Sequence, residues 1–388
     1  MSYKQHFTRF LGSDPQRLHV AAHSHHPWPD VTFHAQQRAW LDAAALQDDK
    51  WGLVLGEVLP EARRHVAHQL RLSDETTVTF ASNTHELVVR LLSCLPTPTR
   101  ILCTDSEFHS FARQARRLEQ AGLAVVEQVS ATPFATFPGR FTDAAARGGH
   151  DLIFFSQVHF TTGYVTPDLE AIVSAVPAPE PFVVIDGYHG FMTLPTDLAA
   201  IEHRVFYLAG GYKYAMAGEG VCFLHCPPGY GPHPVNTGWF ADVADLADPP
   251  QPGQVAYPRD GTRFLGATFD ATGLYRFNAV QRLLGEVGLL VAAIHAYVGR
   301  LQALLLDRLD EVQPHGLGRA TLVPPSEIIQ RAGFLSFRLP DAAEVYQRLH
   351  ARKVITDFRD DCLRIGLGIY HDDADVDELC DRMTAALR

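Results

Sequence analysis

A carboxylate and an amine follow two apolar runs near the middle of the sequence. The first run, residues 181–185, ends at Asp186, and the second, residues 205–209, leads through two glycines and a tyrosine to Lys213. Runs that are apolar on both faces are typical of strands covered on both sides of a sheet. The sequence therefore predicts two strands joined by a crossover, each with an ionisable side chain just beyond its end.

These two side chains have the chemical types that pyridoxal phosphate requires. A lysine amine forms a Schiff base with the aldehyde of the cofactor, and a carboxylate keeps the pyridine nitrogen protonated so that the ring accepts electrons. A carboxylate buried by itself is unfavourable, so Asp186 should have a cationic partner. The alternative is a structural Asp186 and a surface Lys213, which the spacing alone does not exclude.

The residues around the pair decide between these interpretations. They read Asp-Gly-Tyr-His at 186–189, Gly-Tyr-Lys-Tyr at 211–214 and Ala-Gly-Glu-Gly at 217–220. In this order they resemble the class V group of fold-type I pyridoxal-phosphate enzymes, and kynureninase most of all. The resemblance implies that Lys213 carries the cofactor and that Asp186 binds its ring nitrogen. It also makes His189 and Tyr212 candidates for catalysis and cofactor binding.

Strands alternate with helices before this core, which predicts an α/β domain with a mostly parallel sheet and ligands at the carboxyl ends of its strands. Residues 81–84 read Ala-Ser-Asn-Thr between a strand and a helix, a pattern that suits either phosphate binding or a simple N-cap. The resemblance assigns Asn83 and Thr84 to the cofactor phosphate. It places a ring over the cofactor, by alignment Phe108, with His109 as the alternative.

Two later segments resemble parts of the family that cross to a neighbouring subunit. Residues 237–240 read Thr-Gly-Trp-Phe, and residues 266–268 read Gly-Ala-Thr. The resemblance implies a homodimer with shared active sites, in which Trp239 and Thr268 reach the cofactor phosphate. The family's histidine after Gly-Trp is absent, and Gln157 replaces another of its histidines.

The substrate is expected between the C-terminal region and an early loop. Residues 357–359 (Asp-Phe-Arg) and 363–366 (Leu-Arg-Ile-Gly) resemble the kynureninase C-terminal domain, which implies that Arg364 grips a substrate carboxylate with its planar fork. Without the resemblance, a structural salt bridge is the simpler role for this arginine. The His-rich loop before residue 30 is expected to reach the active-site mouth, with His25 as a substrate contact. A solvated loop is the alternative, and the spacing predicts no metal site.

Length and composition bound the remaining possibilities. The chain has 388 residues, 46% hydrophobic and 20% charged. The resemblance divides it into an N-terminal segment (1–45), a large cofactor-binding domain (46–275) and a small C-terminal α/β domain (276–388). A net charge of −11 argues against nucleic acid and anionic membranes as partners. The six cysteines lie mostly in apolar runs, which predicts reduced thiols in a cytoplasmic protein.

The resemblance favours one reaction among several that the cofactor permits. It implies a kynureninase-like hydrolase that cleaves the Cβ–Cγ bond of an amino acid such as kynurenine through an aldimine at Lys213. Another β-lyase, or a class V aminotransferase acting on an unidentified amino acid, is the alternative. The loop after Arg364 lacks the cysteine of a standard desulfurase. A non-catalytic scaffold is disfavoured because Lys213, Asp186 and Arg364 are all present.

Overall fold

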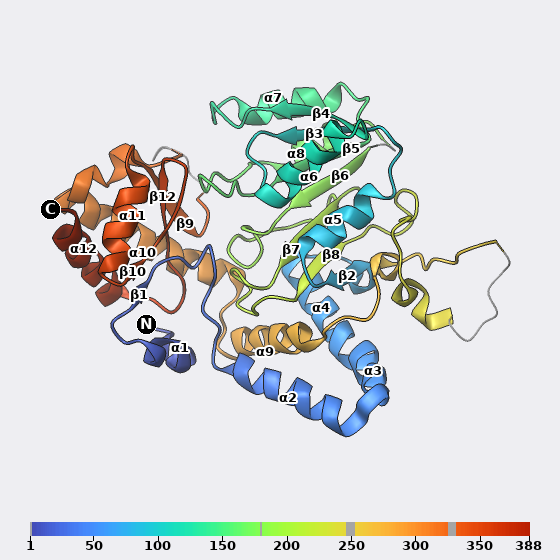
Figure 1. The fold of residues 1–388 in the computed structure, drawn as a ribbon, viewed down its shortest axis with the longest axis horizontal. Coiled ribbons are helices and arrows are strands. Elements are labelled where there is room, and N and C mark those ends of the chain that lie inside the picture. Colours follow the sequence, from blue (N-terminus) through green and yellow to red (C-terminus); the bar gives the residue numbers. More distant parts are fainter. Residues whose placement is uncertain (1, 179–180, 246–252, 325–330) are drawn as a thin grey trace.

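The protein has a large and a small α/β part, with the N-terminal segment running between them (Figure 1). The computed structural model describes residues 2–178, 181–245, 253–324 and 331–388. The predicted boundaries after residues 45 and 275 remain predictions. The first falls at the end of helix α2 (Val31–Leu46), and the second lies inside α9 (Thr272–Glu286).

The large part is built on a seven-stranded sheet in the order β2-β8-β7-β6-β5-β3-β4. Strand β8 runs opposite to the other six strands, so the predicted mostly parallel sheet is confirmed. The strands are β2 (Val78–Ala81), β3 (Thr99–Thr104), β4 (Ala124–Val129), β5 (Leu152–Ser156), β6 (Phe182–Asp186), β7 (Phe206–Gly210) and β8 (Cys222–His225).

Helices cover both faces of this sheet, which explains the uninterrupted apolar runs. Along β6, Val183 and Ile185 belong to one core cluster, whereas Phe182 and Val184 belong to the other. Burying each such side chain contributes roughly 1.5–3 kcal/mol. One face is covered by α5 (Thr84–Leu92) and α6 (His109–Gln120); the other by α4 (Leu59–Leu70), α7 (Phe137–Ala146), α8 (Leu169–Ala175) and α9.

The small part holds a three-stranded antiparallel sheet in the order β11-β12-β9. Its elements are α10 (Val291–Val312), β9 (Phe334–Arg338), α11 (Ala342–Ala351), β10 (Val354–Ile355), β11 (Asp357–Arg359), β12 (Cys362–Gly366) and α12 (Asp373–Leu387). Strand β1 (Leu18–His19) pairs in parallel with β10, and Ala21 bridges to Gly366. These pairings fasten the His-rich loop to the small part.

Two predicted elements are each divided in the structure. The expected helical run over residues 274–309 is two helices, α9 and α10, bent by 80° across residues 287–290, where Gly288 has φ +67°. The expected strand over residues 354–359 is split at Thr356, because β10 pairs with the N-terminal segment and β11 pairs with β12.

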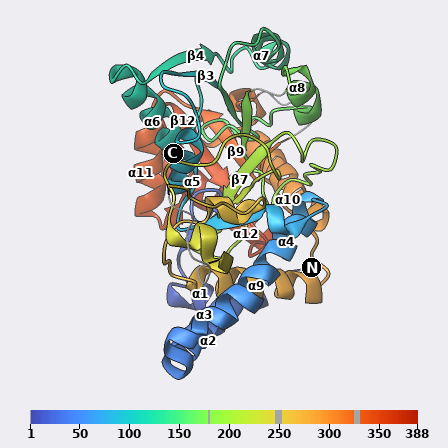
Figure 2. The same cartoon turned by 90° about the vertical axis from the view of Figure 1, so that its right-hand side faces the viewer.

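The remaining helical elements are short or project from the body. Figure 2 shows α2 and α3 at the end of the molecule opposite β4 and α7. These elements are α1 (Thr8–Ser13), α3 (Lys50–Leu53), a π-helical turn (Val54–Val58) and 3-10 helices at Lys4–His6, Gln47–Asp49, Glu75–Thr77, Trp239–Asp245, Gly261–Phe264, Pro314–Gly316 and Arg319–Thr321.

All six cysteines are buried and free. In the described ranges, no helix has by itself the length and apolar character of a membrane span, and only the bent pair α9 and α10 passes that test jointly.

Candidate active site

Lys213 lies in the loop after β7, where the structure buries its amine. Only 5% of the residue is exposed, and Nζ lies 2.5 Å from Nε2 of His189. Burial lowers the pKa of Lys213, and the nearby Asp186 carboxylate opposes that shift. The other lysines of the sequence, Lys4, Lys50 and Lys353, are at least partly exposed. Burial therefore singles out Lys213 as a lysine with a nucleophilic amine.

Asp186 ends β6, the strand next to β7, and its Oδ1 accepts the backbone N–H of Tyr188 at 2.9 Å. Burial raises the pKa of Asp186, while the Tyr188 N–H and the charge of Lys213 oppose the rise. No cationic side chain among the described residues comes within 4.0 Å of this carboxylate. The expected cationic partner of Asp186 is therefore not supplied by the described residues.

Three aromatic rings surround the Lys213 amine. The ring centroids of Tyr188, Phe108 and Tyr212 lie 4.8, 5.4 and 5.7 Å from Nζ. Phe108 precedes the first residue of α6, whereas the neighbouring His109 is exposed. Of the two candidates for the stacking ring, Phe108 is thus the one that lies over the amine.

A glycine makes room for this aromatic group. A Cβ built on Gly210 would lie 2.2 Å from the Tyr188 hydroxyl oxygen and 2.4 Å from Sγ of Cys222. The Tyr188 hydroxyl itself lies 3.4 Å from that sulfur. The position of Tyr188 therefore depends on the missing side chain at residue 210.

The predicted phosphate segment lies at the start of α5. Asn83 acts as the N-cap: its Oδ1 accepts the Glu86 backbone N–H at 3.0 Å, and its Nδ2 donates to the Glu86 carboxylate at 3.0 Å. The Thr84 and Gly211 backbone N–H groups both lie beside the Cys222 thiol. The start of α5 thus adjoins the loop that carries Lys213, and its free N–H groups suit an anion.

The two residues predicted to act across a dimer lie together on the surface. Trp239 is 46% exposed, and its Nε1–H donates to the Thr268 hydroxyl at 3.3 Å. Their assignment to a partner's cofactor phosphate remains a prediction, since the structure contains one chain.

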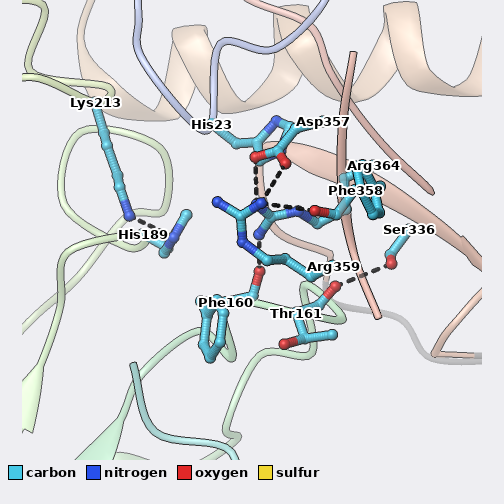
Figure 3. Close-up of polar contacts among 10 residues, drawn as sticks. All are labelled: His23, Phe160, Thr161, His189, Lys213, Ser336, Asp357, Phe358, Arg359 and Arg364. Atoms are coloured by element: carbon cyan, nitrogen blue, oxygen red, sulfur yellow. Dashed lines mark hydrogen bonds and ion pairs between the residues drawn. The ribbon is translucent and has the colours of Figure 1, made fainter. Parts of the chain in front are cut away.

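Arg364 faces the lysine from the small part. It lies on β12 directly opposite Asp357 on β11, and is 3% exposed. Its Nη2 donates to Asp357 Oδ2, and its Nη1 donates to the Phe160 carbonyl. Figure 3 shows the Lys213–His189 pair on one side and the guanidinium of Arg364 on the other. The structure thus brings both predicted ends of the site together.

The His-rich loop contributes two histidines in very different surroundings. His25 is exposed, stacks on Tyr212 with ring centroids 4.9 Å apart, and lies 3.6 Å from the Glu219 carboxylate. His23 is fully buried, stacks on Phe334 at 4.6 Å, and lies 3.8 Å from Asp357 Oδ2. Sequence reasoning selected His25 and missed His23, because only the fold shows which histidine points inward.

Glu107 is a second residue that the sequence analysis missed. It is buried at the end of β3, where its carboxylate accepts the hydroxyls of Thr104 and Ser156, each at 2.6 Å. Burial raises the pKa of Glu107 to about 7, and the charge of Asp186 adds to the rise. Its place just before the predicted stacking ring was a signal that could have drawn attention to it.

Gln157, a departure from the family pattern, has a packing role. Its Oε1 accepts the Tyr207 hydroxyl at 2.8 Å, and its Nε2 donates to the Thr196 hydroxyl at 2.9 Å. A Cβ on Gly190 would lie 2.1 Å from Oε1. This amide therefore supports the loop that carries His189.

The residues present fit pyridoxal phosphate. Asp186 is a half-buried acid without a cationic partner among the described side chains, which suits a protonated ring nitrogen. His189 Nδ1 is buried and has no hydrogen-bond partner within the described part of the chain. The aromatic rings around the amine can cover a flat heteroaromatic ring. Bound pyridoxal phosphate would thus give partners to polar atoms of Asp186 and His189 that have none among the described residues.

Comparison with known proteins also indicates an enzyme that uses pyridoxal phosphate. Residues 294–383 match the family model described as kynureninase C-terminal domain. The chain is 29% identical to isopenicillin N epimerase of Streptomyces clavuligerus over 401 residues, which cover 96% of this chain and 95% of the relative.

Solved structures share the whole fold. A mutant of C-DES with glycine covalently linked to its pyridoxal-phosphate cofactor matches with a TM-score of 0.80 at 17% identity, covering 98% of each chain. The cysteine desulfurase of Thermococcus onnurineus NA1 matches with a TM-score of 0.77 at 14% identity, covering 100% of this chain and 99% of that one. The fold is that of fold-type I pyridoxal-phosphate enzymes, and the three comparisons together support a class V enzyme that uses this cofactor.

The resemblance seen in the sequence is thereby confirmed at the level of this class, and so is the cofactor. When bound, pyridoxal phosphate supplies an electron sink for chemistry at the carbons of an amino acid. In this class V enzyme, the geometry leaves Lys213, His189 and Asp186 to hold and orient it. Arg364 faces these residues from the small part.

Proposed function

We propose that this class V enzyme is a kynureninase-like hydrolase that cleaves the Cβ–Cγ bond of an α-amino acid such as kynurenine. The observation that carries the proposal is the position of Arg364. It lies within the region that matches the kynureninase C-terminal domain and faces the Lys213–His189 pair across the site. A guanidinium there suits the α-carboxylate of an amino acid whose Cα lies near the lysine amine.

Lys213 is the group that moves the α-proton. Because burial lowers the pKa of Lys213, its Nζ can accept a proton near neutral pH and return it later. Burial and the charges of Lys213 and Arg364 hold the pKa of His189 well below its ordinary value. The neutral Nε2 of His189 therefore accepts a hydrogen bond from Nζ and orients it. Asp186 would hold the ring nitrogen of the cofactor.

The reaction consumes one water molecule. Water adds to the γ-carbonyl carbon, the Cβ–Cγ bond breaks, the acyl fragment leaves as a carboxylic acid, and Cβ takes a proton to give alanine. Tyr212, which stacks on His25 at the edge of the site, is our candidate for directing the water. Phe108, which lies beside the Lys213 amine, would cover the ring of the cofactor, and Asn83 and Thr84 at the start of α5 would hold its phosphate.

We also propose a homodimer with shared active sites. Helix α2 projects from the body and exposes apolar side chains, with Trp40 70%, Leu41 55% and Phe33 43% exposed. Exposed apolar groups gathered on one element are a feature of interaction surfaces. Trp239 and Thr268 would then reach the partner's cofactor phosphate.

A second candidate function is epimerisation at the α-carbon. It is favoured by the identity with isopenicillin N epimerase, which extends over 96% of the chain. Epimerisation needs the same proton transfer at Cα but no water and no bond cleavage at Cβ. The two candidates therefore differ in products rather than in the role of Lys213.

The test is a substrate panel with product analysis. The cofactor-loaded enzyme is incubated with kynurenine, 3-hydroxykynurenine, cysteine, and alanine plus a keto acid. We expect an anthranilate-type acid and alanine in equal amounts from the kynurenines, and neither product with Lys213→Ala. Pyruvate, a new amino acid, or inversion at Cα without cleavage would replace the hydrolase proposal by a lyase, an aminotransferase or an epimerase.

A further inference from the structure

The substrate end of the site is organised around one carboxylate, that of Asp357. Its Oδ1 accepts Nη1 of Arg359 at 2.8 Å, and its Oδ2 accepts Nη2 of Arg364. His23 lies on the same side, with Nε2 3.8 Å from Oδ2, too far for a hydrogen bond. We call these four residues the Asp357 cluster; Figure 3 shows them together.

Two members of the Asp357 cluster have buried nitrogen atoms without partners. Nε of Arg364 and both ring nitrogens of His23 have no hydrogen-bond partner in the described part of the chain. His23 is 0% exposed and Arg364 is 3% exposed, so solvent does not reach them freely. Buried polar groups are nearly always paired, so several unpaired ones in one cluster require an explanation, and a bound ligand is one that the cluster could accommodate.

The chain is built to hold the His23 imidazole at this position. The Ala22 N–H donates to the Gly366 carbonyl at 3.1 Å, and the Gly366 N–H donates to the Val20 carbonyl at 2.7 Å. A Cβ on Gly366 would lie 2.3 Å from Nδ1 of His23. On its other side the imidazole stacks on Phe334, with an interplanar angle of 24°. The ring therefore occupies a slot that a glycine leaves open.

The unpaired groups specify the chemistry of their ligand. Arg364 Nε carries a hydrogen and can only donate. Burial and the charge of Arg364 hold the pKa of His23 well below its ordinary value, so its imidazole is neutral and offers one N–H. Two buried donors in the same cluster suit a group with two acceptor oxygens.

We propose that His23 is a substrate-binding residue, and that its N–H and the Arg364 guanidinium together hold the α-carboxylate of the amino-acid substrate. This rests on the proposed function insofar as the substrate is an amino acid. Asp357, held also by Arg359, keeps the guanidinium aimed while the site is free. His25, two residues away, lies at the solvent edge and has no such part.

The simplest alternative is a core histidine that only fills space. Such a residue would lower stability when removed but would not distinguish a carboxylate from an amide. The experiment therefore compares an amino acid with its carboxamide. Both are titrated into the cofactor-loaded enzyme, and binding is followed by the change in cofactor absorbance rather than by turnover.

Wild-type enzyme is compared with His23→Ala and His225→Ala. His225 is a matched control, because it is equally buried but has both nitrogens paired, with Thr77 and with the Glu202 carbonyl. A hydrogen bond to a charged group is worth about 10- to 100-fold in affinity. We expect His23→Ala to weaken binding of the acid by that factor and to change carboxamide binding less than threefold. The His225→Ala control should bind the acid as wild type does.

Gly366→Ala keeps the histidine but displaces its ring, and so tests the same claim without removing the imidazole. It should weaken acid binding in the wild-type background and add nothing in the His23→Ala background. Wild-type affinity for the acid in His23→Ala, an equal loss for acid and carboxamide, or additive effects of the two substitutions would overturn the proposal. The readout is binding and does not require turnover. If an amino acid binds but its Cβ–Cγ bond is not cleaved, the hydrolase proposal fails, and the role of His23 in binding can still be tested with that amino acid.

Discussion

Nζ of Lys213 lies 2.5 Å from Nε2 of His189, and the two residues belong to loops that follow the adjacent parallel strands β7 and β6. Burial lowers the pKa of both groups. Two cations at this distance would repel each other, so at most one of them carries a charge. The pair thus keeps an amine ready for covalent chemistry in a chain where the other lysines are at least partly exposed.

Asp186→Asn should affect the cofactor and the apoprotein in opposite directions. It removes the charge that holds the ring nitrogen, so cofactor retention should weaken about 10- to 100-fold, with a larger loss of activity. It also removes a half-buried carboxylate whose pKa is raised by desolvation, so the cofactor-free variant should melt no lower than wild type. Cofactor titration and thermal melts measure both effects. Unchanged cofactor retention would be incompatible with the assigned role.

Arg364→Lys should raise KM far more than it lowers kcat. A lysine keeps the charge but loses the planar fork, and the loss of one charged hydrogen bond corresponds to about a 10- to 100-fold effect. Arg338→Lys is the matched control, since Arg338 is also borne on a strand and paired with an aspartate but is largely exposed. Steady-state kinetics on the substrate identified by the panel measures the effect. Equal KM values for Arg364→Lys and Arg338→Lys would indicate that Arg364 has only a structural role.

Glu107→Gln should change how stability depends on pH. The pKa of Glu107 rises from 4.5 to about 7 on folding, so between these values the folded chain holds a proton that the unfolded chain has released. Its contribution to stability therefore falls as pH rises from about 4.5 to about 7, by up to about 3 kcal/mol. The glutamine variant cannot ionise at this position, so it does not lose stability in this way as the pH rises. Its unfolding free energy relative to wild type should increase between pH 5 and pH 8, and a pH-independent difference would contradict the raised pKa.

Gly210→Ala should destabilise the site by crowding Tyr188. The added Cβ would lie 2.2 Å from the tyrosine hydroxyl oxygen, and such overpacking costs about 1–3 kcal/mol. We expect a lower melting temperature and weaker cofactor retention. Gly299→Ala in α10 meets nothing within 4 Å and should be neutral or slightly stabilising. Equal melting temperatures and equal cofactor retention in Gly210→Ala and Gly299→Ala would contradict this prediction.

Much of the large part was predictable because its strands are covered on both faces. The runs that end at Asp186 and Lys213 are apolar throughout, and parallel strand ends meet at one edge of a sheet. The sequence could not decide between Phe108 and His109, because the answer depends on where α6 begins.

The small part was harder to predict because its pairings join distant segments. The strand expected at 354–359 divides at Thr356 only because residues 18–19 add to it. The burial of His23 depends on Phe334, Asp357 and Gly366, which are more than 300 residues away. Local periodicity contains no information about such contacts. The break between α9 and α10 did have a local signal in Gly288, which adopts a positive φ.

The most direct test of the central claim is to locate the covalently held cofactor. The loaded enzyme is reduced with borohydride, digested and analysed by mass spectrometry, with Lys213→Ala treated in parallel. We predict the reduced pyridoxyl-phosphate mass on the peptide that contains Lys213, and no modified peptide in the variant. Attachment at Lys4, Lys50 or Lys353, or an unmodified Lys213 in protein that retains the cofactor, would contradict it.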